Sequence, residues 1–196
     1  SFPYPAILKP RFGAGSAGVS WIEDAHCEVV WDDRFSEYRL EQYCPGIAVS
    51  VAALRGPAGV FVLPACQQLL SRDHRFQYLG GTVPIAEALA RRAERLALCV
   101  VDVLPPSVGY LGIDLVLGET EEADRIIEIN PRLTTSYVGL SQLTKDNLAE
   151  AMLGVALGDS CTLRFRSEPV YFDATGAGVA VEDRHRSPAT GQGVRA

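Results

Sequence analysis

Residues 125–133 read RIIEINPRL, and this stretch decides how the rest of the sequence is interpreted. Successive side chains of a β-strand point to opposite faces of the sheet. Glu128, Asn130 and Arg132 would therefore share one face, while two isoleucines and Pro131 take the other. An acid, an amide and an arginine on one side of an otherwise apolar strand predict a polar site where the strand ends.

A second strand-like stretch, GYLGIDLVLG at 109–118, carries Asp114. We expect it to pair with 125–130, which would bring Asp114 close to Glu128 and Asn130. Two carboxylates and an amide oxygen suit Mg²⁺, and one carboxylate can bridge two such ions. The alternative is that Asp114 and Glu128 pair with arginines on a solvated sheet face. A polar set on such apolar strands would, however, be costly without a ligand.

A glycine-rich segment, RFGAGSAG at 11–18, follows the apolar strand PAILKP, whose Lys9 is one of only two lysines among 18 basic residues. An ammonium beside unshielded backbone N–H groups can hold phosphate. The alternative is a flexible hairpin. No GK[ST] follows, as in a Walker A loop, and no helical pattern follows, as in a dinucleotide fingerprint. The candidate phosphate-binding residues are Lys9, Gly13, Gly15, Ser16 and Gly18.

The composition excludes several classes of protein. A net charge of −6 argues against a nucleic-acid partner, because phosphate backbones require concentrated basic residues. No apolar run reaches the roughly 20 residues of a membrane span. The five scattered cysteines, without CxxC spacing, indicate reduced thiols in a cytoplasmic protein.

The hydrophobic pattern predicts an α+β fold in which helices pack on antiparallel strands. Three histidines, His26, His74 and His185, have no partner spacing and are interpreted as surface or hydrogen-bonding residues. Gln67, Gln68 and Arg72 are weaker candidates for an acceptor pocket. The expected strands are 38–43, 47–54, 59–63, 110–117, 125–130 and one near 169–172, and the expected helices are 85–104 and 141–157.

Five motifs in a fixed order resemble the carboxy-terminal part of an ATP-grasp ligase, over residues 3–157. They are the PAILKP strand, the GAGSAG loop, an EQYCPG hinge followed by VSV, the YLGIDLVL strand and the EINPR strand end. The hinge residues LEQY, taken alone, would be interpreted as an ordinary edge strand. The stretches INPRLTTSYVGL and YLGGTVP are most similar to a carboligase-like subgroup that includes tyramine:glutamate ligase.

The resemblance implies an ATP-grasp fold with ATP between two small subdomains. About residues 1–60 would cover the nucleotide and about 61–160 would bind metal, followed by a terminal strand region at 161–180 and a disordered tail at 181–196. The family's amino-terminal domain is absent from this sequence. We therefore expect the chain to be a fragment, completed by a missing amino-terminal domain or by a homo-oligomer.

The resemblance also implies roles for the residues already singled out. Lys9 would contact the ATP phosphates, and the Gly13–Gly18 loop with Ser16 would close over them. Glu41 and the backbone of Gln42 and Tyr43 would bind the adenine. Asp114, Glu128 and Asn130 would hold two Mg²⁺ ions, and Arg132 would steady the phosphoryl group in transfer. Ala48 stands where many relatives carry an acid for the ribose.

The implied activity is that of an ADP-forming ligase, which uses ATP and Mg²⁺ to join a small-molecule carboxylate to an amine through an acyl phosphate. Two alternatives remain: a nucleotide-binding module without catalysis, and a phosphotransferase that stops after phosphorylating its substrate. Asp114, Glu128, Asn130 and Arg132 together argue against the first, because binding alone does not require the metal set and the arginine.

Overall fold

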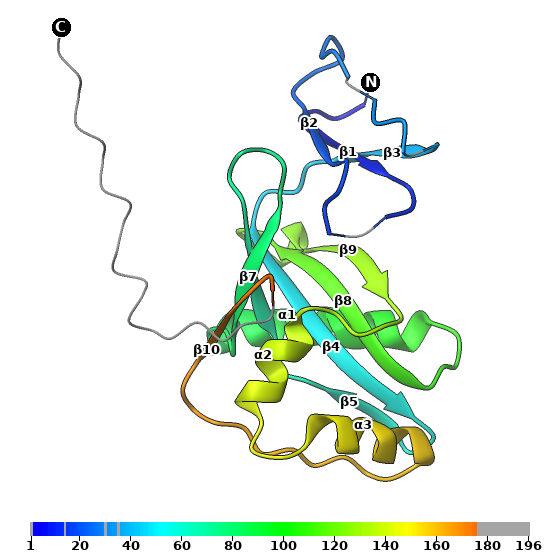
Figure 1. The fold of residues 1–196 in the computed structure, drawn as a ribbon, viewed down its shortest axis with the longest axis vertical. Helices are drawn as coiled ribbons and strands as arrows, with labels where there is room; N and C mark the ends of the chain where they lie inside the picture. Colours follow the sequence, from blue (N-terminus) through cyan, green and yellow to red (C-terminus); the bar gives the residue numbers. More distant parts are fainter. Residues whose placement is uncertain (1, 14, 30, 35, 176–196) are drawn as a thin grey trace, which may run out of the picture.

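The strands of the chain form two antiparallel sheets, seen one above the other in Figure 1. The computed structural model describes residues 2–13, 15–29, 31–34 and 36–175, so the expected tail at 181–196 lies outside the described residues. The small sheet has the order β2-β1-β3 and consists of β1 (Ala6–Pro10), β2 (Ser20–Ile22) and β3 (Tyr38–Gln42).

The larger sheet has seven strands in the order β10-β7-β6-β4-β8-β9, with β5 paired to β4. Its strands are β4 (Ile47–Gly56), β5 (Gly59–Val62), β6 (Cys66–Leu70), β7 (Tyr78–Val83), β8 (Gly109–Leu117), β9 (Arg125–Asn130) and β10 (Val170–Asp173). The helices are α1 (Glu87–Val103), α2 (Ser136–Leu143) and α3 (Leu148–Leu157), with a short 3₁₀ turn at Glu121–Ala123. This is the expected α+β architecture.

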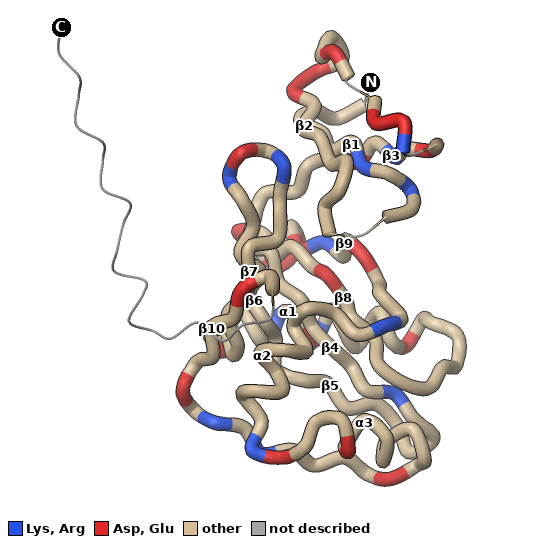
Figure 2. The backbone as a smooth tube through the Cα atoms, viewed as in Figure 1, with Lys and Arg blue, Asp and Glu red and all other residues tan. Residues whose placement is uncertain are grey.

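Strand β4 lies inside the larger sheet and is buried on both faces. Val49, Val51 and Ala53 belong to the core that packs on α1, whereas Ala52 and Leu54 belong to the core under α2 and α3. Charged residues lie mostly in loops and at strand ends, while most of β4 and β5 carries none (Figure 2). Because side chains alternate between the two faces of β4, Ser50 lies on the same face as Ala52 and Leu54, which is the face toward α2 and α3.

The pairing of β4 changes the expected division between subdomains. A boundary between subdomains near residue 60 would have placed this strand with the smaller sheet. Instead, β4 pairs with β8 from Ile47↔Leu117 to Arg55↔Gly109. The run IAVSVAAL is apolar on both faces, and only a sheet covered by helices on both sides can bury it. The chain thus leaves the small sheet at Gln42 and enters the large one at Ile47.

The single helix expected at 141–157 is wrong, because two helices with a break between them occupy this region. The Thr144 hydroxyl donates a hydrogen bond to the Arg164 carbonyl (3.2 Å). Asn147 then begins α3, its side chain accepting a hydrogen bond from the Glu150 backbone N–H (3.2 Å). Short polar side chains that bond to the backbone compete with a continuous helix and favour a new start.

Three strands, β2, β6 and β7, were not expected from the sequence. In β7 the pair Gly80-Gly81 suggests a turn, yet it permits close packing. A Cβ on Gly80 would lie 2.2 Å from the Phe172 carbonyl oxygen, and one on Gly81 would lie 2.7 Å from the Phe172 ring. Glycine within a strand often marks such a close approach of another backbone.

The connection between β8 and β9 is fixed to α1 by a buried ion pair. Arg92 donates to Asp124 (Nε to Oδ2, 3.1 Å), and Asp124 also accepts a hydrogen bond from the Gly118 N–H (2.9 Å). The two side chains are 15% and 4% exposed. Of the helices in the described part of the chain, none has the length and apolar character needed to cross a membrane.

Replacing Phe172 tests whether β10 is an integral part of the fold. The ring is 1% exposed, so Phe172→Ala should lower the free energy of unfolding by about 3–5 kcal/mol. Leu157→Ala, at a residue 84% exposed, is the control and should change it by less than about 0.5 kcal/mol. Chemical denaturation measures both, and equal effects would show that β10 does not contribute to the core.

Candidate functional site

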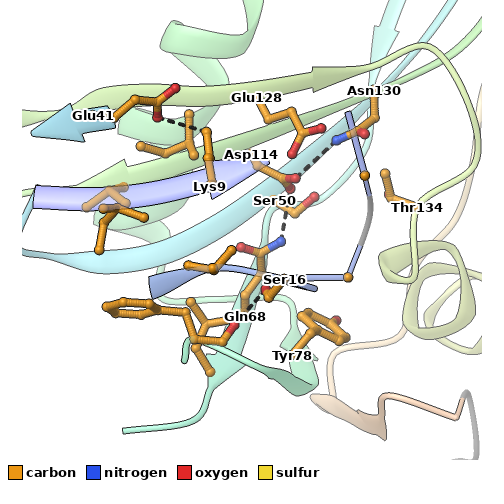
Figure 3. A pocket seen from close by; sticks show the side chains of 18 of the residues that line it. Lys9, Ser16, Glu41, Ser50, Gln68, Tyr78, Asp114, Glu128, Asn130 and Thr134 are labelled. Atoms are coloured by element: carbon orange, nitrogen blue, oxygen red, sulfur yellow. Dashed lines mark hydrogen bonds and ion pairs between the residues drawn. The ribbon is translucent and has the colours of Figure 1, made fainter. Parts of the chain in front are cut away.

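A cavity of about 950 Å³ lies between the two sheets. The small sheet and the glycine-rich loop border one side, and β4, β6, β8 and β9 border the other (Figure 3). Of the weaker candidates for an acceptor pocket, Gln68 borders this cavity, whereas Gln67 and Arg72 do not. Among the residues expected to bind the nucleotide, the metal or the phosphoryl group, Gly18 alone does not border it, and lies instead on a second cavity of about 700 Å³ behind the loop. The remainder are Lys9, Gly13, Gly15, Ser16, Glu41, Gln42, Tyr43, Asp114, Glu128, Asn130 and Arg132.

The expected pairing of β8, which carries Asp114, with β9, which carries Glu128 and Asn130, is confirmed. Asp114 pairs with Glu128, and Gly112 with Asn130, so these polar side chains share the cavity face. The next pair is Leu115 with Ile126, which leaves Ile127 as an extra residue on β9. Such a β-bulge changes the alternation of a strand locally. Figure 3 shows Asp114, Glu128 and Asn130 converging on one part of the cavity.

Asp114 is held between two side-chain amides. Gln68 donates to its Oδ1 (2.9 Å) and Asn130 donates to its Oδ2 (3.1 Å). Burial raises the pKa of Asp114, the Ser50 hydroxyl lowers it, and the charge of Glu128 raises it further. The carboxylate is thus poorly solvated beside a second acid, a situation that a bound cation would relieve.

Ser50 faces the same carboxylate from β4, directly opposite Asp114 in the strand pairing. The residue is 2% exposed, and among the described residues its hydroxyl is the one buried side-chain polar atom without a hydrogen bond of ordinary geometry. It does interact with Asp114, whose pKa it lowers, so the hydroxyl is not isolated but its hydrogen-bonding capacity is only partly used. Ser50 is therefore a candidate ligand-binding residue.

Ser50 was missed by the sequence analysis, and Gln68 was only a weak candidate there. Ser50 is the single polar residue in the apolar run IAVSVAAL, which was the available signal. Gln68 reaches the site because β6 pairs with β4, as in Ser50↔Cys66. A local sequence pattern does not predict that β6 lies next to β4 in the sheet.

The small sheet presents a pair of opposite charges to the cavity. Lys9 Nζ lies 2.8 Å from Glu41 Oε2, and Arg39 Nη1 lies 3.3 Å from Glu41 Oε1. The ammonium expected at the phosphates is therefore paired with the carboxylate expected at the adenine (Figure 3). An arriving phosphate group would have to compete with Glu41 for Lys9.

The far end of the cavity is closed by the segment between β9 and α2. A Cβ on Gly112 would lie 2.3 Å from the Thr134 methyl group, so glycine there lets this segment rest on the sheet. The Thr134 hydroxyl lies 2.8 Å from Ser136 Oγ and 3.1 Å from the Tyr110 hydroxyl. Arg132, in the same segment, donates to the Leu133 carbonyl (3.2 Å), and its charge lowers the pKa of Asp114.

The donor atoms fit a hard cation that takes only part of its coordination from protein. In the described ranges no group of three or more His, Cys, Asp or Glu side chains is placed to hold a metal. Asp114, Glu128 and Asn130 offer two carboxylates and one amide oxygen. Mg²⁺ binds in this way, through one or two carboxylates, with water and phosphate oxygens completing its octahedron.

Comparison with known proteins finds relatives that are ligases. A tyramine–L-glutamate ligase from Methanocaldococcus jannaschii is 30% identical over 136 residues, which are 69% of this chain and 42% of that protein. The corresponding enzyme of Methanocaldococcus fervens is 28% identical over 127 residues, 65% of this chain and 40% of that protein. The chain thus spans about two fifths of the length of these relatives.

Solved structures share the fold. Carboxyaminoimidazole ribonucleotide synthase from Aspergillus clavatus, complexed with ATP, has a TM-score of 0.67 at 16% identity and covers 86% of this chain and 45% of its own. A family model described as the ATP-grasp domain matches residues 1–136. Because this match covers more than half of the sequence, the chain belongs to the ATP-grasp domain family.

Proposed function

We propose that this chain forms the nucleotide and metal site of an ATP- and Mg²⁺-dependent ligase that joins a carboxylate to an amine. One observation carries the proposal. Asp114, Glu128 and Asn130 converge on a 950 Å³ cavity whose opposite wall contains Lys9 and the glycine-rich loop. A wall of anionic oxygens facing a cation and backbone N–H groups suits a metal–polyphosphate complex.

The nucleotide would lie along β4 and β8, starting from the hinge. Gln42 and Tyr43 border the cavity just before β4 begins, and their backbone would face the adenine. The Ala48–Val116 pair comes next and then the Ser50–Asp114 pair, so the phosphates would arrive at the acidic residues. Ala48 offers nothing to the ribose hydroxyls, which the proposal leaves to another residue.

The chemistry would proceed in two balanced steps. An oxygen of the substrate carboxylate attacks the γ-phosphorus, the bond to the β-phosphate oxygen breaks, and ADP leaves. The amine nitrogen then attacks the acyl carbon, and phosphate departs with the amine's proton. Arg132 would neutralise charge on the phosphoryl group in both steps, and positioning would supply most of the remaining acceleration.

Mg²⁺, when bound, would supply charge neutralisation at the β- and γ-phosphates. Asp114 and Glu128 would hold it through carboxylate oxygens, and Asn130 through its amide oxygen. Asn130 at present donates its N–H to Asp114, which leaves the amide oxygen for a cation. Gln68 would keep one Asp114 oxygen fixed while the other faces the metal.

The named relatives support a ligase over the alternatives. The relatives of known activity are ligases that act on small molecules. A nucleotide-binding module without catalysis would bind ATP and release no phosphate. A phosphotransferase would release ADP with the acid alone.

Replacing Glu128 tests the catalytic proposal. Glu128→Gln keeps the size of the side chain but removes a charged metal ligand, and should reduce the rate by at least about 100-fold. The measurement is ADP and phosphate release with MgATP and a panel of carboxylic acids and amines. Glu119→Gln, at an exposed acid in the β8–β9 connection, is the control. An unchanged rate in Glu128→Gln would refute the metal assignment.

Replacing Asp114 tests its burial without any substrate. The folded-state pKa of Asp114 is raised, so its ionised form destabilises the fold at neutral pH, and this penalty disappears as pH falls below the unfolded pKa. Asp114→Asn should therefore raise the melting temperature at pH 7 without divalent ions, by about 2–4 °C for each 1 kcal/mol relieved. The gain should shrink toward pH 4.

The control is Asp102→Asn, at an exposed acid on α1, which should leave the melting temperature nearly unchanged. Mg²⁺ with ATP should then stabilise the wild-type chain and not Asp114→Asn, because only a bound ligand shifts the folding equilibrium. A lower melting temperature for Asp114→Asn at pH 7 would contradict the unfavourable burial of this charge.

A further inference from the structure

The turn between β6 and β7 projects from the larger sheet toward the small sheet (Figure 1). Its His74 ring stacks on Trp21 of β2, with centroids 4.7 Å apart and planes at 27°. Phe76, from the same turn, lies 6.3 Å from Trp21 and 6.1 Å from Tyr43. Trp21 and Tyr43 are themselves 4.8 Å apart. We call these four residues the aromatic clasp.

The glycine-rich loop is tied to the same turn by a hydrogen bond. The Ser16 hydroxyl donates to the Phe76 carbonyl at 2.7 Å. A serine hydroxyl has a single proton to donate. While this bond is formed, Ser16 cannot donate to a phosphate oxygen, and that role passes to the backbone N–H groups of the loop.

Three residues at this junction have backbone angles that favour glycine. The φ angles are 60° at Ser16, 62° at His74 and 52° at Phe76, and these are the positive-φ residues other than glycine in the described part of the chain. Such conformations are unfavourable and persist where surrounding contacts hold them. Both partners of the hydrogen bond, and the histidine of the stack, thus adopt strained conformations at one point of contact.

We infer that the aromatic clasp positions the glycine-rich loop over the cavity, and that Ser16 anchors the loop and does not bind phosphate itself. His74 borders the second cavity, behind the loop, and not the larger one. His74 is therefore a positioning residue that acts through Trp21 and the turn. The inference rests on the proposed nucleotide site, because positioning the loop matters only if phosphates bind beneath it.

The first experiment measures the loop in the chain without ligand. His74→Asn removes the ring, yet asparagine tolerates positive φ, so the turn should remain intact. Backbone amides of residues 13–18 should then exchange with deuterium about 2- to 10-fold faster, the effect of losing one aromatic contact. Arg72→Ala, an exposed change in the same turn, is the control and should leave exchange unchanged. Unchanged exchange in His74→Asn would overturn the inference.

The second experiment is a double-mutant cycle on MgATP affinity with Ser16→Ala and His74→Asn. Trp21 fluorescence reports binding if all variants carry Trp31→Phe. Two residues that act through one positioned loop should show strongly non-additive losses, because the first change already releases the loop. Additive losses, or a loss confined to Ser16→Ala, would show that Ser16 binds phosphate directly, which would overturn its role as an anchor.

The two experiments separate the inference from the proposed function. If the wild-type chain and all variants fail to bind MgATP, the proposed nucleotide site is wrong. Faster loop exchange in His74→Asn would in that case still establish the clasp as a structural contact, and the inference that it serves nucleotide binding would be rejected.

Discussion

The half-buried carboxylate of Asp114 is the constraint on which the site depends. The larger sheet is covered by α1 on one face and by α2 and α3 on the other, but the helices leave uncovered the part of the sheet around Ser50. An acid there is only partly solvated and lies beside neutral amides, a hydroxyl and another acid, an unfavourable setting that the charge of Arg132 offsets only in part. The fold tolerates this arrangement because the rest of the sheet is well packed, and a cation would reverse its cost.

The small sheet is stabilised differently. Its buried core consists of Ala6, Leu8 and Ile22, too little apolar surface to fix its position firmly. Its place over the cavity depends on the short hinge after Gln42 and on the aromatic clasp. Lys9 and Arg39 both pair with Glu41, and Arg11 also borders the cavity, so this wall carries more positive than negative charge. The wall formed by the large sheet thus carries the two acids Asp114 and Glu128, and the wall formed by the small sheet carries an excess of positive charge.

The sequence predicted those parts of the site that depend on neighbouring residues. Alternation within RIIEINPRL and GYLGIDLVL places Glu128, Asn130 and Asp114 on one face, and their pairing followed from proximity along the chain. Gln68 and Ser50 depend on the order of strands in the sheet, which no short pattern encodes. The assignment of β4 to the smaller subdomain was wrong for a similar reason. The sequence does not show at which of two turns the chain passes from one sheet to the other. The helix at 141–157 was mistaken because a polar cap in mid-segment outweighed its periodicity.

The extra residue at Ile127 separates the two ends of β9. Without it, each residue added to or removed from the connection at 118–124 would turn the Glu128 side chain from the cavity to the opposite face. The bulge compensates for such a one-residue shift. On either side of Ile127, the side chains of β9 alternate between the two faces of the sheet independently. Arg92 and Asp124 can therefore fix the connection to α1 in whatever register packs best. The packing of the connection on α1 and the geometry of the proposed metal ligands can in this way vary independently, although both depend on the six residues of β9.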